Sequence, residues 1–353
     1  MSFTEKGMTF ERLDDHCRRA KKLDFDPVSS RFIFLSDSHK WDRSGVDFFS
    51  AVEPVYLGAL DYYNSNQFTL VLLGDIEEGA GDKLPHVLKS YPGTFSIEKK
   101  FLPNRYMRIY GNHDHDWKKD DVRLLLDNIM DFKVEVWPAL LLGGNIMVVH
   151  GHEGDLFSDE LHNITQVILR WFKKIVERIF GKSPSAAENS RVRSSRAKLL
   201  YKWGKRNRMI VIAGHTHLAY FESISLTRIR YKAIHNLEKT LQTGPQVNIS
   251  VKKRDELVRM KRFRTVHDHF WKKNESLPEG SLPLYFNTGC CKYEDGLTGI
   301  EIAEGRISLV KWTYVSGGAP NREVLASRRI SEILAGNKSL QVKRGNGLRS
   351  LRQ

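Results

Sequence analysis

The stretch Tyr110-Gly111-Asn112-His113-Asp114 decides how the fold of this chain is predicted. The apolar run that ends at Tyr110 predicts a buried strand. Gly111 allows a sharp turn and a close approach of the backbone to a ligand. Asn112, His113 and Asp114 then place an amide oxygen, an imidazole and a carboxylate at one strand end. On its own such a stretch is most often an ordinary polar turn, so its meaning depends on the rest of the chain.

Four other apolar runs end in the same kinds of polar residue. In open α/β folds, ligand sites form outside the carboxyl ends of the strands, so strands of this kind would bring their polar ends to one place. Chance is a poor explanation for five such ends in one chain. The runs are Phe32–Ser36 before Asp37 and His39, Leu70–Leu73 before Asp75, Ile146–Val149 before His150 and His152, and Ile210–Ala213 before His215 and His217.

Taken together, the five blocks resemble the calcineurin-like metallophosphoesterase superfamily. They read Asp-x-His, Gly-Asp, Gly-Asn-His-Asp, His and Gly-His-x-His, and they occur in that family's order between Ser36 and Leu218. The resemblance implies an α/β fold, a four-layer α/β/β/α sandwich, as a single domain over residues 1–353. It also implies a metal-dependent phosphoric ester hydrolase that cleaves a phosphoester or pyrophosphate bond.

The resemblance implies a role for each polar strand end. One metal would be held by Asp37, His39, Asp75 and His217, and the other by Asp75, Asn112, His150 and His215. Asp75 would bridge two divalent ions, and these would hold a hydroxide nucleophile and a phosphoryl oxygen. Oxygen and imidazole ligands together suit Mn, Fe or Zn rather than calcium, and Mn is the metal that we expect first.

His113 has a different implied role. In the family, the His of Gly-Asn-His-Asp is not a ligand but protonates the leaving oxygen or stabilises the transition state. An acidic residue three positions after the bridging Asp orients this His, and Glu78 holds that position, with Glu77 as the alternative. His152 and Asp155 are further candidates for contacts to substrate or support of the ligands, with an ordinary loop role as the alternative.

Departures from known subfamilies narrow the predicted substrate. Ser/Thr protein phosphatases of this superfamily have Asp-Arg-Gly after the Gly-Asp block and Glu after Asn-His. This chain has Glu78-Gly79 and Asp114 there, which disfavours a protein phosphatase. A basic insertion after His150 makes the layout similar to UDP-2,3-diacylglucosamine pyrophosphatases, although these commonly have Arg in place of His113. We therefore expect a nucleotide-sugar or lipid-linked phosphate substrate. A nuclease or nucleotide phosphodiesterase is a second candidate and a non-catalytic scaffold a third, and the filled ligand positions argue against the scaffold.

Composition limits the partners and the compartment. A hydrophobic fraction of 41% in 353 residues is ordinary for a globular protein with a sizeable core. The net charge of +14 favours anionic partners, namely phosphorylated substrates or an anionic membrane surface, with nucleic acid less favoured. Three cysteines give no disulfide framework, and no signal peptide or membrane-spanning run is evident. We expect a cytoplasmic protein, with peripheral membrane attachment as an alternative.

Two insertions and a tail interrupt the predicted alternation of strands and helices. Residues 157–206 carry an amphipathic pattern with a basic outer face, which predicts an inserted helical cap. Such a cap either packs on the core or contacts a membrane or lipid substrate. Residues 222–283 form a second basic insertion, and residues 316–353 a basic C-terminal tail.

The rest of the chain is predicted to form the helices and strands of the core. Helices are expected within 1–30, 46–66 and 120–130, strands at 133–142 and 284–287, and a hairpin at 297–315.

Overall fold

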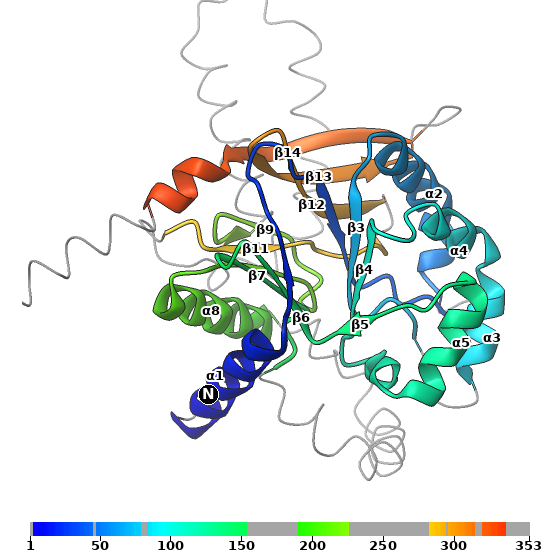
Figure 1. Ribbon diagram of the computed structural model, residues 1–353, viewed down its shortest axis with the longest axis horizontal. Coiled ribbons are helices and arrows are strands. Elements are labelled where there is room, and N and C mark those ends of the chain that lie inside the picture. The colour runs from blue at the N-terminus through cyan, green and yellow to red at the C-terminus, as the bar shows by residue number, and fades with distance from the viewer. Residues whose placement is uncertain are drawn as a thin grey trace, which may run out of the picture.

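The computed structural model describes residues 3–44, 47–78, 83–153, 190–225, 282–293, 296–314 and 320–336. These residues form two β-sheets packed face to face, with helices on both outer sides (Figure 1). The four layers are the α/β/β/α sandwich that the sequence predicts. In the described residues, no helix combines the length and apolar character needed to cross a bilayer.

The first sheet carries three of the five polar strand ends. Its order is β14-β13-β12-β2-β3-β4-β5, and β2 to β5 run parallel. Because both faces of this part of the sheet are covered, β2 and β3 are nearly continuous apolar runs rather than alternating ones. The strands are β2 (Phe32–Leu35), β3 (Thr69–Leu73), β4 (Tyr106–Ile109), β5 (Val136–Trp137), β12 (Leu297–Ala303), β13 (Arg306–Thr313) and β14 (Asn321–Arg329).

The second sheet carries the other two polar strand ends. Its order is β1-β6-β7-β8-β11-β9-β10, and β7 and β8 run parallel, so their carboxyl ends are neighbours. The strands are β1 (Lys21–Leu23), β6 (Ala139–Leu142), β7 (Ile146–Val149), β8 (Ile210–Ala213), β9 (Tyr220–Phe221), β10 (Ile224–Ser225) and β11 (Tyr285–Asn287).

Helices complete the two outer layers (Figure 1). The outer face of the first sheet is covered by α2 (Phe49–Ser65), α3 (Leu84–Ser90), α4 (Pro92–Lys99) and α5 (Asp120–Met130), with the short 3₁₀ helix η2 (His115–Lys118) before α5. The second sheet is covered by α1 (Phe3–Arg19) and α8 (Ser190–Asn207). Two local signals explain where helices start. The helix α4 begins at a proline, whose fixed φ suits the first helical position. The helix α5 has two aspartates in its first turn, and their negative charges stabilise the positive N-terminal end of the helix dipole.

The chain changes sheets at Pro138. The sequence pattern places one strand at 133–142, but the structure has two, β5 in the first sheet and β6 in the second. A proline has no backbone N–H to donate to a ladder, so strand pairing ends at Trp137 and begins again at Ala139. A single residue therefore separates β5 from β6, and the chain also passes between the sheets from β1 to β2 and from β11 to β12.

Two segments that the sequence analysis sets apart as cap and tail contribute an element to the sandwich, and for the cap this agrees with the alternative in which it packs on the core. Residues 190–206, assigned by sequence to an inserted cap, form most of α8, and the buried side chains of Ala197, Leu200 and Trp203 pack in the core of the second sheet. Residues 321–329, assigned to the tail, form β14, an edge strand that pairs with β13. Its Arg322 forms an ion pair with Glu301 of β12, which anchors this basic strand. The remainder of the cap (157–189), most of the second insertion (226–281) and residues 337–353 lie outside the described residues.

A buried ionic network holds the segments that follow β2 and β3. Lys40 Nζ lies 2.8 Å from Glu98 Oε1, and Arg108 pairs with Glu77, with all four side chains buried. Trp117 Nε1 donates to Glu77 at 3.1 Å. Backbone hydrogen bonds join the same segments. The N–H of Lys40 donates to the carbonyl of Ile76, and the N–H of Glu78 donates to the carbonyl of Lys40. The segment that follows β2 is therefore fixed against the segment that follows β3.

We expect Lys40→Met to lower the free energy of unfolding by about 3–5 kcal/mol, because it leaves the carboxylate of Glu98 buried without its cation. Urea denaturation of both proteins at pH 7 measures the difference. Lys119→Met is the matched control: it removes an exposed pair with Asp116 and should cost less than about 1 kcal/mol. Equal effects of the two substitutions would show that the buried network does not stabilise the fold.

This stability difference should depend on pH. Burial raises the pKa of Glu98, but the charges of Lys40 and Arg108 outweigh burial and lower that pKa below its ordinary 4.5. A lowered carboxyl pKa contributes stability that is present above pH 4.5 and lost as the pH falls through the folded value. The gap between wild type and Lys40→Met should therefore be complete at pH 7 and shrink below pH 4.5, whereas a gap that stays constant to pH 3 would contradict the assignment.

Candidate metal centre

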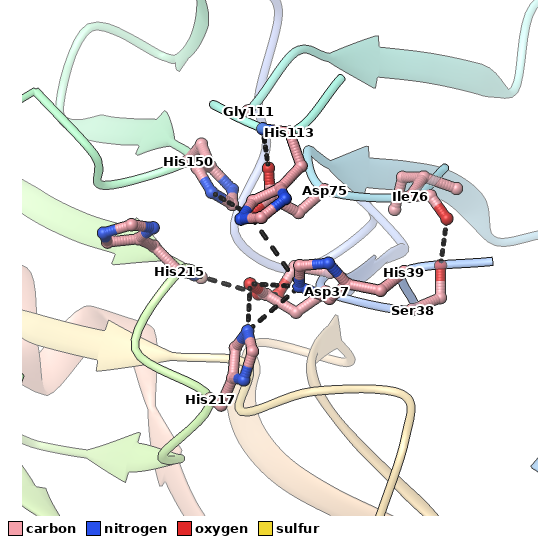
Figure 2. A network of polar contacts seen from close by, with 12 residues as sticks. Asp37, Ser38, His39, Asp75, Ile76, Gly111, His113, His150, His215 and His217 are labelled. Carbon is pink, nitrogen blue, oxygen red and sulfur yellow. Dashed lines mark hydrogen bonds and ion pairs between the residues drawn. The ribbon is translucent and has the colours of Figure 1, made fainter. Parts of the chain in front are cut away.

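The polar strand ends of both sheets meet at one place (Figure 2). The first sheet contributes residues after β2, β3 and β4, and the second contributes residues after β7 and β8. The side chains that lie together are Asp37, His39, Asp75, His113, His150, His215 and His217. The structure thus gathers the Asp and His residues that the sequence singles out as ligands, together with His113, while their individual roles stay predictions.

Three overlapping groups of ligand-type atoms make up the site. Within each group, one ligand atom from every residue lies within 4.8 Å of the others. Asp75 and His39 each belong to two groups, so the three are joined into one centre. The groups are Asp37 with His39 and His217, Asp75 with His150 and His215, and His39 with Asp75 and His113.

Each carboxylate uses one oxygen to hold the loops and turns the other into the site. Asp37 Oδ2 accepts the backbone N–H of His215 at 2.9 Å, and its Oδ1 faces His217 Nε2 at 3.2 Å. Asp75 Oδ1 accepts the backbone N–H of His113 at 2.9 Å, and its Oδ2 faces His150 Nε2 at 3.2 Å. The inner oxygen of each carboxylate is therefore directed at imidazole nitrogens of the other sheet.

Three buried side-chain atoms of the strand-end loops make no hydrogen bond of good geometry among the described residues, although two of them make the 3.2 Å ion-pair contacts given above. They are Asp37 Oδ1, Asn112 Oδ1 and His150 Nε2. His150 Nδ1 donates to the carbonyl of Leu73 at 2.6 Å, so in the neutral ring the lone pair of Nε2 would face the site. Without a metal, burial lowers the pKa of His150, but the charge of Asp75 outweighs burial and raises that pKa to about 10. Buried polar atoms without partners are costly, and oxygen and imidazole donors in this mixture suit a first-row transition metal. The residues present therefore fit a metal centre, and the buried oxygen of Asn112 is consistent with the ligand role that the sequence predicts for it.

The backbone at the site is held in an unusual conformation. Asp37, His39, Asp75, His215 and His217 all have positive φ, between 46° and 67°. Residues with a side chain rarely adopt this left-handed region, and such strain persists mainly where function requires a particular side-chain direction. Five of the predicted ligands share this strain, which supports the interpretation of these turns as one functional site.

Glycines allow the loops after β3 and β4 to touch. Gly74 has φ +81°, and a Cβ added there would lie 2.5 Å from the backbone nitrogen of Gly111. No side chain fits in that space, so the two loops are in backbone contact. Asp114 ties the same loops, because its carboxylate accepts the N–H of Gly111 at 2.6 Å and that of Ile76 at 2.8 Å. The sequence places Asp114 at a strand end but gives no signal for this role in joining the two loops.

Glu78, rather than Glu77, faces the site. Its Oε1 lies 2.8 Å from His113 Nδ1 and its Oε2 lies 2.6 Å from His39 Nδ1, so one carboxylate orients both rings. Glu77 points the other way, into the buried network with Arg108. His113 is 43% exposed, so its ring lies open to a bound substrate.

The electrostatics keep the carboxylates ionised and His113 charged. Burial raises the pKa of Asp37 and of Asp75, but the nearby imidazoles outweigh burial and lower both below their ordinary value. Desolvation lowers the pKa of His113, whereas the charge of Asp75 and the hydrogen bond to Glu78 raise it to about 9. Burial lowers the pKa of His217 to about 4 against the opposing charge of Asp37. The site thus offers carboxylates and a neutral imidazole to a cation, and a protonated His113 at its mouth.

His152 lies beside His150 and His215. Its ring centre is 5.4 Å from that of His150 and 6.4 Å from that of His215. Burial lowers its pKa to about 3, so the ring is neutral at physiological pH. This position fits support of the ligands rather than contact with a substrate. Asp155, the other candidate in this segment, lies outside the described residues.

The fold and the site define a metal-dependent phosphoric ester hydrolase. Residues 30–219 match the family model of the calcineurin-like phosphoesterases. This span is more than half of the chain, and the chain belongs to that family. No curated protein matches the sequence at a significant level. The finer likeness to UDP-2,3-diacylglucosamine pyrophosphatases stays a prediction.

We expect Asp75→Asn to lose bound metal, because Asp75 belongs to two of the three groups. The fall in metal affinity should exceed the roughly 10–100-fold that loss of an outer-shell partner costs. Elemental analysis of the purified variant after equilibration with Mn²⁺ measures this. Asp120→Asn, an exposed carboxylate at the start of α5, is the control and should bind metal as wild type does. A variant at position 75 that keeps two metals and the full rate would exclude a bridging role.

Proposed function

We propose that this protein hydrolyses a phosphoester or pyrophosphate bond at a centre of two divalent metal ions. The observation that carries the proposal is the pair of groups Asp37–His39–His217 and Asp75–His150–His215, joined because Asp75 also lies with His39. Asn112 would complete the second set through its unpaired oxygen. Two such ions, of Mn, or alternatively Fe or Zn, supply Lewis acidity and an activated water at neutral pH when they are bound.

The chain's own contribution to bond cleavage is a proton donor. His113 Nδ1 hydrogen-bonds to Glu78, which leaves Nε2–H to donate to the leaving oxygen. Since the pKa of His113 is about 9, this ring carries its proton at pH 7. Glu78 acts through His113 and His39, and it is therefore a positioning residue.

The substrate class that we propose is a phosphorylated small molecule, either a nucleotide sugar or a lipid-linked phosphate. The net charge of +14 supports an anionic substrate and, for a lipid-linked one, attachment to an anionic membrane surface. The order of the sequence blocks supports the nucleotide-sugar assignment. Competing assignments are a nuclease or nucleotide phosphodiesterase, a Ser/Thr protein phosphatase and a scaffold without activity.

A panel of substrates tests the proposal. The protein, loaded with Mn²⁺, is offered an aryl phosphate, an aryl phosphodiester, a nucleotide sugar, a phosphopeptide and single-stranded DNA. We expect the nucleotide sugar to be cleaved with the highest kcat/KM. Preferred cleavage of DNA would indicate the nuclease, and preferred cleavage of the phosphopeptide would indicate the protein phosphatase. No cleavage of any substrate by protein that holds two metals would contradict the enzymatic assignment.

Substitution of His113 should separate proton donation from metal binding. His113→Asn should keep its metals, and the rate on a substrate with a poor leaving group should fall by roughly 10²–10⁴, the usual contribution of general acid catalysis. The rate on 4-nitrophenyl phosphate should fall less, because 4-nitrophenolate leaves without a proton.

Two further variants serve as comparison. Glu78→Gln should show the same dependence on the leaving group with a smaller loss, since it weakens the charge that holds the His113 proton. His86→Asn, at an exposed position in α3, should behave as wild type. An equal loss on both kinds of leaving group in His113→Asn would rule out the acid role.

A further inference from the structure

A cavity of about 540 Å³ lies between α1 and the segment that joins β4 to α5. One face of α1 lines this cavity with Arg12 and His16. The opposite wall is formed by Tyr110, which follows β4, and by His115 and Lys118 of η2. The mechanism proposed for the metal centre leaves this cavity without a role.

The orientation of α1 is fixed by its contacts with the second sheet and with α8. Leu13 is fully buried in the core of that sheet. Asp14 accepts a hydrogen bond from Trp203 Nε1 of α8 at 2.8 Å, and Arg206 of the same helix lies 3.1 Å from this carboxylate. Because side chains three and four positions apart share one face of a helix, this packing turns the face that lines the cavity away from the core.

The cavity lies next to the metal centre. The ring of Tyr110 packs edge-on between His16 and His115, with ring centres 6.4 Å and 5.5 Å away. His152 also lines the cavity, and its ring centre is 6.5 Å from that of His16 and 5.4 Å from that of His150. A single imidazole ring therefore forms the wall between the cavity and the group of predicted ligands to which His150 belongs.

The lining of the cavity carries an excess of positive charge. Among the lining residues are four arginines or lysines and two carboxylates, which leaves two positive charges in excess. One of the carboxylates, Asp15, is shared by Arg18 and Arg19, which lie 3.3 Å and 3.2 Å from it. Arg12 and Lys118 belong to opposite walls. A concave surface with cations on both sides concentrates anions, so the cavity suits a negatively charged group.

We propose that this cavity binds a second phosphate of the substrate, while the phosphoryl group to be cleaved lies at the metal centre. This inference rests on the proposed function, because the first phosphoryl group is the one that the metal ions would hold. Arg12 would donate two parallel hydrogen bonds to the second phosphate. Lys118, whose ammonium lies 2.6 Å from His115 Nε2, would add a point charge from the other wall. The helix α1 would thereby distinguish a substrate with two phosphates from a monophosphate.

Binding of phosphonates tests this inference without turnover, because their P–C bonds are not hydrolysed. The probes are hexane and decane with a phosphonate at each end, each compared with the alkyl phosphonate of the same length. They are titrated calorimetrically into the Mn²⁺-loaded protein, with bound metal and thermal unfolding measured on the same samples. We expect the better bisphosphonate to bind roughly 10–100-fold more tightly than its monophosphonate, the value of hydrogen bonds to a charged group on a tethered ligand.

Substitutions in the two walls should remove this advantage. In the double variant Arg12→Gln with Lys118→Gln, both kinds of ligand should bind with the affinity that wild type has for the monophosphonate. Arg12→Lys should keep part of the advantage, and each single variant is measured too, so that the test does not depend on the folding of the double variant. Lys89→Gln with Lys202→Gln is the matched control, since it removes the same charge at exposed positions of α3 and α8 and should keep the full advantage.

The outcomes distinguish a failure of this inference from a failure of the proposed function. Equal affinities of wild type for bisphosphonates and monophosphonates, or an advantage that the double variant keeps, overturn the role of the cavity whatever the enzyme cleaves. Inorganic phosphate that binds twice, with the second equivalent lost in the double variant and no advantage for bisphosphonates, would assign the cavity to a free ion and overturn the substrate subsite. Conversely, an advantage that depends on Arg12 and Lys118 in a protein that hydrolyses none of the panel substrates would support the cavity and contradict the enzymatic assignment.

Discussion

Two buried carboxylates, Asp37 and Asp75, set the main constraint on this structure. Both are almost fully inaccessible to solvent, yet both keep their charge. A buried charge is tolerated only where partners replace the lost water. Here each carboxylate receives a backbone N–H from a neighbouring loop on one oxygen, while its other oxygen faces imidazoles. The left-handed turns and the glycine contact between loops follow from the need to bring these partners within reach.

The sequence predicts the site well because the signal is local. Each predicted ligand follows a short apolar run, and such runs become strands whose ends are easy to place. The same holds for α5, whose bounds agree with the prediction of a helix from Asp120 to Met130. The left-handed backbone at five of these positions leaves no local trace, because Asp and His occur in many other turns. It becomes visible only once the strands are assembled.

Elements that depend on pairing with distant strands were not predictable in this way. The strand β1, with the sequence Lys-Lys-Leu, has no apolar pattern and exists because β6 pairs with it. The basic strand β14 depends likewise on β13. The neighbours Glu77 and Glu78 are alike as residues, and only the backbone direction sends one to the core and the other to His113. Both roles are needed, because the buried network on Glu77 steadies the loop that presents Glu78.

Predicted ligands from both sheets would give the metal centre a mechanical role. The group of Asp37, His39 and His217 takes residues from both sheets, and so does the group of Asp75, His150 and His215. Ions bound there would cross-link the two sheets, as a disulfide bond links segments that are distant in the sequence. Sliding of one sheet over the other would break coordination on both ions at once. The loaded protein should therefore open as one cooperative unit, and the slowest-exchanging amides should include those of β2, β3, β7 and β8.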